Sequence, residues 1–176
     1  MKNPRTPNTP RGASSTPVGE PPAESPSAGS ETTAAGPRRI LLVDDDRAVR
    51  ESLGEVLTSE GYAVLPAEDG EKALELAARE QIDLVMLDLN MPVKSGWDTL
   101  KHLTTEQPLL PVVVITARPN QVFTAVGAGV AALIEKPIDC RHLLKTIRKL
   151  LVEPVGPRIA RSVGKPAPFY YGQAPG

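Results

Sequence analysis

The sequence has little cysteine and no excess of charge of one sign. Cys140 is its single cysteine, so no disulfide can form within the chain, which suits a reducing compartment. Its 20 Lys and Arg residues and 21 Asp and Glu residues leave a formal net charge of -1. Such a balance argues against binding to nucleic acid or to an anionic membrane surface. We therefore predict a cytoplasmic protein whose partners include neither nucleic acid nor membrane.

Long apolar runs are also missing. Residues 1–7 lack the apolar core of a signal peptide. The most apolar stretch, residues 109–117, is far too short to span a bilayer and contains Pro111. The sequence thus predicts neither a secretion signal nor a membrane span.

Both ends of the chain are rich in proline and small residues. Residues 1–37 have almost no large apolar side chain and cannot bury enough surface to offset the chain entropy lost on folding. Residues 153–176 are again rich in Pro and Gly, although they contain the aromatic cluster 169–171. That cluster is either a short docking motif or, more simply, a chance feature of a tail. We expect both end segments to be disordered, which leaves 38–152 as one folded domain.

Between these segments, short apolar runs alternate with stretches whose apolar residues recur at helical spacing. The expected strands are 40–43, 62–65, the run within 83–92 that ends at Asp88, 111–116 and 131–134, and a helix follows each of them. Asp46 and Asp139 are expected to cap helices, and His102 and His142 to lie on helix surfaces. Five strands alternating with five helices predict an α/β fold, namely a doubly wound, five-stranded parallel sheet with helices on both faces.

The residues that follow these strands are polar. In an open parallel sheet the carboxyl ends of the strands share one edge, where such folds place their sites. The first strand brings Asp44 and Asp45 to this edge, the third Asp88, the fourth Thr116 and the fifth Lys136. Carboxylates about 4 Å apart repel each other by roughly 4 kcal/mol per pair at a dielectric near 20, so they call for a cation, and an all-oxygen set favours Mg²⁺. A carboxylate nucleophile beside an ammonium group and a hydroxyl group could then receive a phosphoryl group.

The motifs at these strand ends resemble the signature of response-regulator receiver domains. The matching motifs are Val43-Asp44-Asp45, Leu87-Asp88 with Asn90-Met91-Pro92 and Gly96, Ile115-Thr116-Ala117, and Glu135-Lys136-Pro137. The resemblance covers essentially all of 38–152, and each motif lies on the appropriate predicted element. It implies a flavodoxin-like or CheY-like (βα)5 fold.

The resemblance also implies a role for each acidic residue. Asp88 would accept a phosphoryl group from a histidine of a sensor kinase or of a histidine phosphotransfer protein. Asp45, Asp88 and the main-chain carbonyl of Asn90 would ligate Mg²⁺ directly, and Asp44 would act through a bound water. A cis peptide bond is implied before Pro137.

Two further residues would respond to phosphorylation, and two features depart from the family pattern. Lys136 would pair with Asp88 and then with the phosphoryl oxygens, while Thr116 would move inward to hydrogen-bond them. Leu133 occupies a place where the family usually has Tyr or Phe, so the aromatic switch is absent, and the stretch 116–136 is about two residues shorter than usual. Arg118 lies at a position that tunes dephosphorylation in the family.

We therefore predict a stand-alone receiver that switches an unknown downstream protein, as a monomer or as a phosphorylation-dependent homodimer, and that is not an enzyme. Two alternatives remain open at this point. The first is a receiver-fold scaffold that never cycles, which Leu133 and the short fourth-helix region favour. The second is a phosphohydrolase of the dehalogenase-like class, but that class requires an acid two residues after the nucleophile, where this chain has Asn90.

Overall fold

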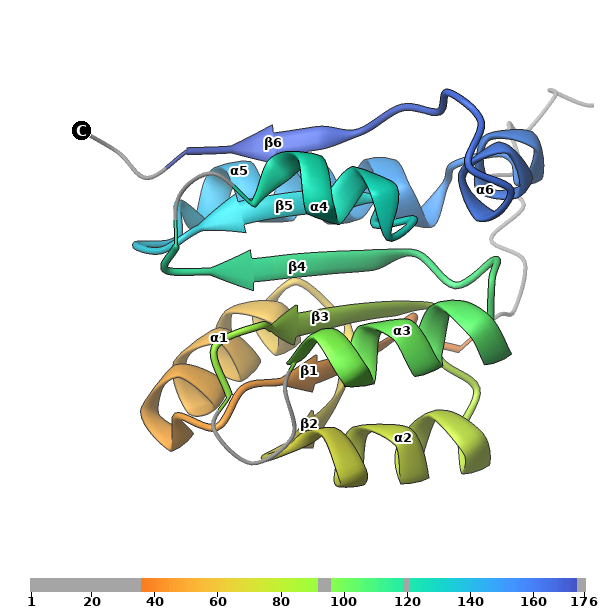
Figure 1. The fold of residues 1–176 in the computed structure, drawn as a ribbon. Helices are drawn as coiled ribbons and strands as arrows, with labels where there is room; N and C mark the ends of the chain where they lie inside the picture. Colours follow the sequence, from red (N-terminus) through yellow and green to blue (C-terminus); the bar gives the residue numbers. More distant parts are fainter. Residues whose placement is uncertain (1–35, 92–95, 119–120, 174–176) are drawn as a thin grey trace, which may run out of the picture. The chain divides into compact units, whose positions relative to one another are not determined.

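The computed structural model describes residues 36–91, 96–118 and 121–173 (Figure 1). The expected disorder of residues 1–37 therefore falls almost entirely outside the described residues. Within the described ranges the chain forms six strands and six helices. These ranges contain no helix that is long and apolar enough to cross a membrane.

The strands form one parallel sheet in the order β2-β1-β3-β4-β5-β6. Their bounds are β1 Arg39–Val43, β2 Ala63–Ala67, β3 Leu84–Asp88, β4 Val112–Thr116, β5 Ala132–Glu135 and β6 Tyr170–Gly172. The order runs outward in both directions from β1 and β3. That reversal point is where doubly wound sheets place their sites, and it confirms the predicted fold class.

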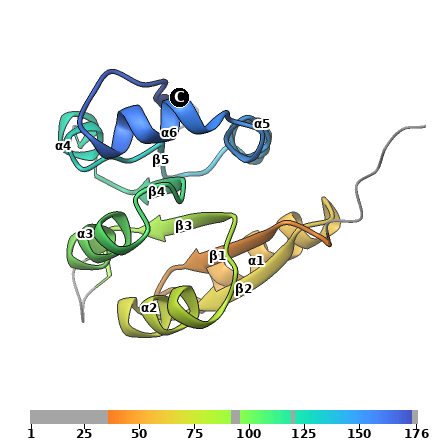
Figure 2. The ribbon, with the colours of Figure 1, turned by 90° about the vertical axis from the view of Figure 1, so that its right-hand side faces the viewer.

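The helices cover both faces of the sheet, with α2, α3 and α4 on one side and α1 and α5 on the other (Figure 2). Their bounds are α1 Arg47–Ser59, α2 Gly70–Arg79, α3 Gly96–Glu106, α4 Val122–Gly127, α5 Cys140–Leu151 and α6 Val155–Ser162. Alternate strand residues therefore enter two separate cores: Leu41 belongs to the same core as Leu100 of α3, whereas Leu42 belongs to the core that includes Leu57 of α1 and Ile147 of α5. Burial on both faces explains why the central strands are apolar throughout rather than alternating.

Helix starts follow the capping residues in the sequence. The Asp46 carboxylate accepts hydrogen bonds from the main-chain N–H groups of Ala48 and Val49, and Asp139 caps α5 in the same way. Both predicted caps are thus confirmed. The bond between Lys136 and Pro137 is cis, as the resemblance implied.

The C-terminal segment corrects the expectation that residues 153–176 are disordered and that the sheet has five strands. Residues 155–162 form α6, and residues 170–172 form β6, which pairs in parallel with β5. Phe169 packs against the core beneath α2, α3 and α4, and Tyr170 packs against the core on the opposite face. The high content of Pro and Gly made these two partly buried aromatic anchors hard to recognise from the sequence.

Polar contacts also hold this segment. Arg161 forms a bidentate pair with Glu153 at 2.7 and 3.1 Å, and both side chains are less than 10% exposed. The Tyr171 hydroxyl donates to Glu135 Oε1 at 2.7 Å. His142 is half-buried rather than on the surface as expected, because its ring lies against Gly172, where a Cβ would come within 2.7 Å of His142 Cδ2.

Candidate functional site

The carboxyl edge of the sheet brings the predicted polar residues together. Asp44 directly follows β1, and Asp88 ends β3, the neighbouring strand, while Thr116 ends β4. Asp44, Asp88 and Thr116 are 1%, 2% and 0% exposed. Lys136 directly follows β5 and points its ammonium group back toward the centre of this edge. Several buried ionisable side chains at one place are rare in proteins unless they are paired with each other or bind an ion.

Three carboxylates form the acidic part of the site. One oxygen each from Asp44, Asp45 and Asp88 lies within 4.8 Å of the other two, and Asp45 is exposed while the others are buried. Burial raises the pKa of Asp44, and the neighbouring Asp88 acts in the same direction; hydrogen bonds from Lys136 and from the N–H of Asp46 only partly oppose this. The protein therefore keeps these carboxylates close at a cost in stability.

A single cation lies between two of these acids. Lys136 Nζ is 2.7 Å from Asp88 Oδ2 and 3.0 Å from Asp44 Oδ2. Burial acts to lower the pKa of Lys136, but its hydrogen bonds to both carboxylates outweigh this and raise the pKa. One ammonium group faces three carboxyl groups, so the site has more acidic groups than cations. The set of oxygen donors therefore fits a hard divalent cation such as Mg²⁺.

Asn90 fixes the orientation of Asp88. Its main-chain N–H and its side-chain Nδ2 donate to Asp88 Oδ1 at 2.8 and 3.2 Å, and Nδ2 also lies 3.5 Å from Thr116 Oγ1. One oxygen of Asp88 is thus bound by Asn90 and the other by Lys136. The predicted metal contact of the Asn90 carbonyl stays a prediction.

Thr116 makes contacts that the sequence did not indicate. Its hydroxyl donates to Gln121 Oε1 at 3.0 Å and accepts from the N–H of Arg118 at 3.0 Å. Gln121 immediately precedes α4, and no motif in the sequence marks it. The Arg118 side chain is exposed at the rim, and its predicted effect on dephosphorylation stays a prediction.

The start of α3 packs tightly under the site. A Cβ at Gly96 would lie 2.5 Å from the carbonyl oxygen of Asp88 and 2.5 Å from Cα of Leu89. Only a residue without a side chain allows this approach, which explains why the motif read from the sequence has glycine there. The helix thereby supports the backbone that carries Asp88.

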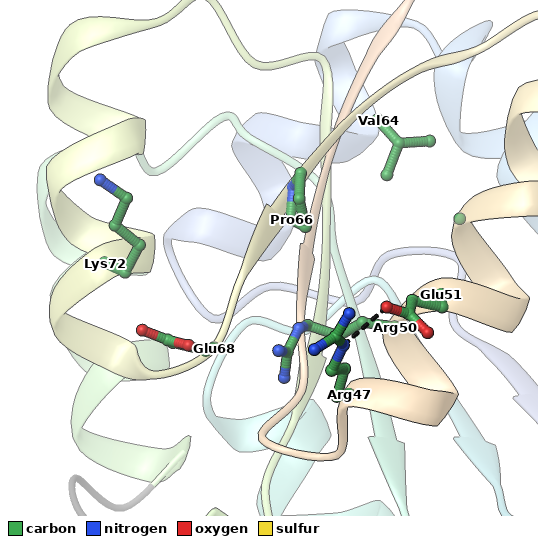
Figure 3. Close-up of a pocket in the computed structure, with 8 residues that line it drawn as sticks. Arg47, Arg50, Glu51, Val64, Pro66, Glu68 and Lys72 are labelled. Carbon is green, nitrogen blue, oxygen red and sulfur yellow. Dashed lines mark hydrogen bonds and ion pairs between the residues drawn. The ribbon is translucent and has the colours of Figure 1, made fainter.

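Arg50 is a second residue that sequence reasoning missed. Its Nη1 donates to the carbonyl oxygen of Asp44 at 2.6 Å. Arg50 lines a pocket of about 450 Å³ between α1, β2 and the start of α2 (Figure 3). Of the lining residues, Arg47 pairs with Glu51 at 2.7 Å, and Lys72 pairs with Glu75, which lies outside the lining, at 2.9 Å. Because two of its three cations are already paired, the pocket is less suited to an anion than its composition suggests.

Comparison with known proteins agrees with this geometry. Residues 40–148 match the family described as the response regulator receiver domain. The chain is 43% identical over 117 residues to the response regulator MprA of Mycolicibacterium vanbaalenii, covering 65% of this chain and 51% of that protein. It is 43% identical over 115 residues to the transcriptional regulatory protein CpxR of Escherichia coli K12, covering 64% and 49%. The chain thus spans about half the length of these curated relatives.

Solved structures show the same fold. A CheY-like receiver domain protein from Methanospirillum hungatei has a TM-score of 0.63 at 30% identity, over 66% of this chain and 94% of that one. TrrA from Thermotoga maritima, solved in complex with Mg²⁺ and BeF, has a TM-score of 0.61 at 31% identity, over 64% and 98%. Neither likeness extends over the whole of the present chain, and the family match stops before α6 and β6.

Proposed function

Because the chain belongs to the response regulator receiver domain family, we propose that it is a phosphorylation switch that accepts a phosphoryl group on Asp88. The donor is a phosphohistidine of a sensor kinase or of a histidine phosphotransfer protein. The observation that carries this proposal is the buried Asp88 carboxylate, oriented by Asn90 and Lys136 beside the acids Asp44 and Asp45.

Asp88 acts as the nucleophile. One of its oxygens forms a bond to phosphorus while the bond between phosphorus and the donor imidazole nitrogen breaks. The electron pair of that bond stays on the imidazole, which takes a proton from solvent. Lys136 is 24% exposed and already touches Asp88, so its ammonium group can follow the negative charge onto the phosphoryl oxygens.

The acidic residues prepare the site for the phosphoryl group. Asp45 and Asp88, with the Asn90 carbonyl, would hold Mg²⁺, and Asp44 would reach it through water. When bound, Mg²⁺ supplies positive charge opposite the phosphoryl oxygens. Without it, the three carboxylates repel an anionic donor, so the reaction requires the metal.

The output of the proposed switch is a contact with another protein. The family implies a protein partner for output, and we propose that the chain turns over no substrate other than its own phosphoryl group. The curated relatives are about twice as long as the matched region, so their further activities are not transferred to this chain. The predicted absence of a nucleic-acid partner and the predicted homodimer stay predictions.

The scaffold alternative is favoured by one specific observation. Leu133 is fully buried on β5 and carries no polar group that could respond to Thr116. The hydrolase alternative is weaker, because the amide of Asn90 occupies the place of the required second acid and binds Asp88.

Incubation of the full chain with acetyl phosphate and Mg²⁺, followed by intact mass spectrometry, tests the proposal. We expect the mass of one phosphoryl group to be added to the native chain and not to Asp88→Asn. Asp46→Asn is the matched control: it removes an adjacent acid but keeps a capping residue, so it should be phosphorylated normally. Equal phosphorylation of Asp88→Asn and the native chain would contradict the proposal, and no uptake by the native chain would favour the scaffold.

A further inference from the structure

We propose that Gln121 is a positioning residue that holds the Thr116 hydroxyl away from Asp88 and links it to the start of α4. This inference rests on the proposed function. Nothing in the motifs or the comparisons assigns a role to Gln121.

The first step is that the Thr116 hydroxyl has only one proton to donate. A threonine hydroxyl donates one hydrogen bond and accepts up to two. The Thr116 proton goes to Gln121 Oε1 at 3.0 Å, and its lone pairs face the N–H of Arg118 at 3.0 Å and Asn90 Nδ2 at 3.5 Å. The hydroxyl is fully buried, so it cannot offer a second proton through a rotation into solvent.

The second step is the position of this hydroxyl relative to the Asp88 carboxylate. Asn90 Nδ2 contacts both Thr116 Oγ1 and Asp88 Oδ1, so one amide group separates Thr116 from the phosphorylated carboxylate. A phosphoryl group on Asp88 adds strong acceptor oxygens and no donor. Thr116 can donate to these oxygens only if it releases Gln121. Phosphorylation therefore competes directly with the bond between Thr116 and Gln121.

The third step is what Gln121 does at the helix. Gln121 is the N-cap residue of α4, and its side chain makes no capping hydrogen bond within the described part of the chain. Its side-chain amide oxygen accepts the hydrogen bond from Thr116 instead of one from a main-chain N–H of the first turn, where N–H groups lack partners within the helix. When Thr116 changes partner, this oxygen becomes free for the first turn of α4. A change at the phosphorylated residue thus reaches α4 although Leu133 carries no polar group.

The test removes the acceptor while keeping the length of the side chain. Gln121→Met leaves the Thr116 proton free, so the full chain should bind beryllofluoride with Mg²⁺ more tightly. We expect about a fivefold gain in affinity, which corresponds to about 1 kcal/mol for one ordinary hydrogen bond. Gln81→Met makes the same change at an exposed position between α2 and β3 and should leave the affinity unchanged.

Two further measurements separate this role from a merely structural one. In a Thr116→Val background, Gln121→Met should have no effect on beryllofluoride affinity, because Gln121 acts through the hydroxyl. In the ligand-free chain, NMR couplings of the Thr116 methyl group should report one rotamer for the native protein and a mixture for Gln121→Met.

The results of these experiments distinguish a failure of the proposed function from a failure of the proposed role of Gln121. If the native chain binds no beryllofluoride, both the proposed function and the role of Gln121 are overturned. If the native chain binds it but Gln121→Met binds it equally well or more weakly, only the role of Gln121 is overturned. An effect of Gln121→Met that persists in Thr116→Val, or a Thr116 rotamer that Gln121→Met leaves unchanged, overturns it as well.

Discussion

The site at the carboxyl edge and the C-terminal segment on β5 lie in the same sheet but are held in opposite ways. At the site, buried like charges of Asp44 and Asp88 are kept close at a cost in stability and are balanced by Lys136. The C-terminal segment is held by aromatic packing of Phe169 and Tyr170 on both faces of the sheet. The proposed function uses the charged region, whereas the aromatic region holds β6 against the edge of β5. The four changes below test this difference, from the largest expected effect to the smallest.

Lys136→Met should produce the largest loss of stability. It leaves Asp44 and Asp88 buried and facing each other without a cation, and breaking such a pair costs about 3 kcal/mol or more. Urea unfolding without metal measures the loss, and added Mg²⁺ should recover part of it. Lys101→Met, an exposed change on α3, should stay within about 0.5 kcal/mol. Equal losses for both variants would show that the site is not under electrostatic strain.

Gly172→Val should release β6 without affecting the site. Its Cβ would meet the ring of His142, and overpacking of this kind costs about 1–3 kcal/mol. Hydrogen exchange of the β5 amides should accelerate, while phosphorylation of Asp88 should persist. Gly156→Ala on α6, where a Cβ meets nothing within 4 Å, is the control. Loss of phosphorylation in Gly172→Val would mean that the two regions are coupled.

Asp44→Asn should have the opposite sign and stabilise the metal-free chain at neutral pH. Because the folded-state pKa of Asp44 is raised, the folded chain binds more protons than the unfolded chain between the unfolded value near 3.8 and the raised value. Stability therefore falls as pH rises through that window, and Asp44 costs stability above it. Removing the charge should gain on the order of 1 kcal/mol. The free energy of unfolding, measured at several pH values, should depend less on pH in Asp44→Asn than in the native chain. An unchanged pH dependence would contradict this prediction.

Tyr171→Phe should have the smallest effect. The bond between the Tyr171 hydroxyl and Glu135 lies at an exposed position, so its loss should cost about 0.5 kcal/mol. Glu135→Met, which removes the acceptor, should cost a similar amount, and the double variant should cost no more than either alone. Additive losses would show that the two side chains do not act through one bond.

Much of the fold could be predicted from the sequence because its signals are local. The first strand was expected at 40–43 and lies at Arg39–Val43, and the fourth was expected at 111–116 and lies at Val112–Thr116. The fourth-helix region, expected to be short, contains α4, which spans only Val122–Gly127. Two glycines at 127 and 129 lower the helix propensity there.

The remaining features depend on contacts that follow from the folded path of the chain and not from local propensity. Tyr170 becomes a strand residue only because β5 offers an unpaired edge and two cores lie beside it. Arg50 reaches Asp44 only through the path of the chain after β1. Gln121 reaches Thr116 only through the path of the chain before α4. None of these contacts leaves a periodic pattern or a motif.

By itself, the sequence determined the parallel sheet and the residues that meet at its carboxyl edge. It could do so because strand polarity and right-handed crossovers fix which residues end each strand. Only the tertiary structure decided that the C-terminal segment is folded and that Thr116 donates to Gln121. Both follow from packing and hydrogen bonding in the folded chain, where the free energy depends on which groups are left without partners rather than on local propensity.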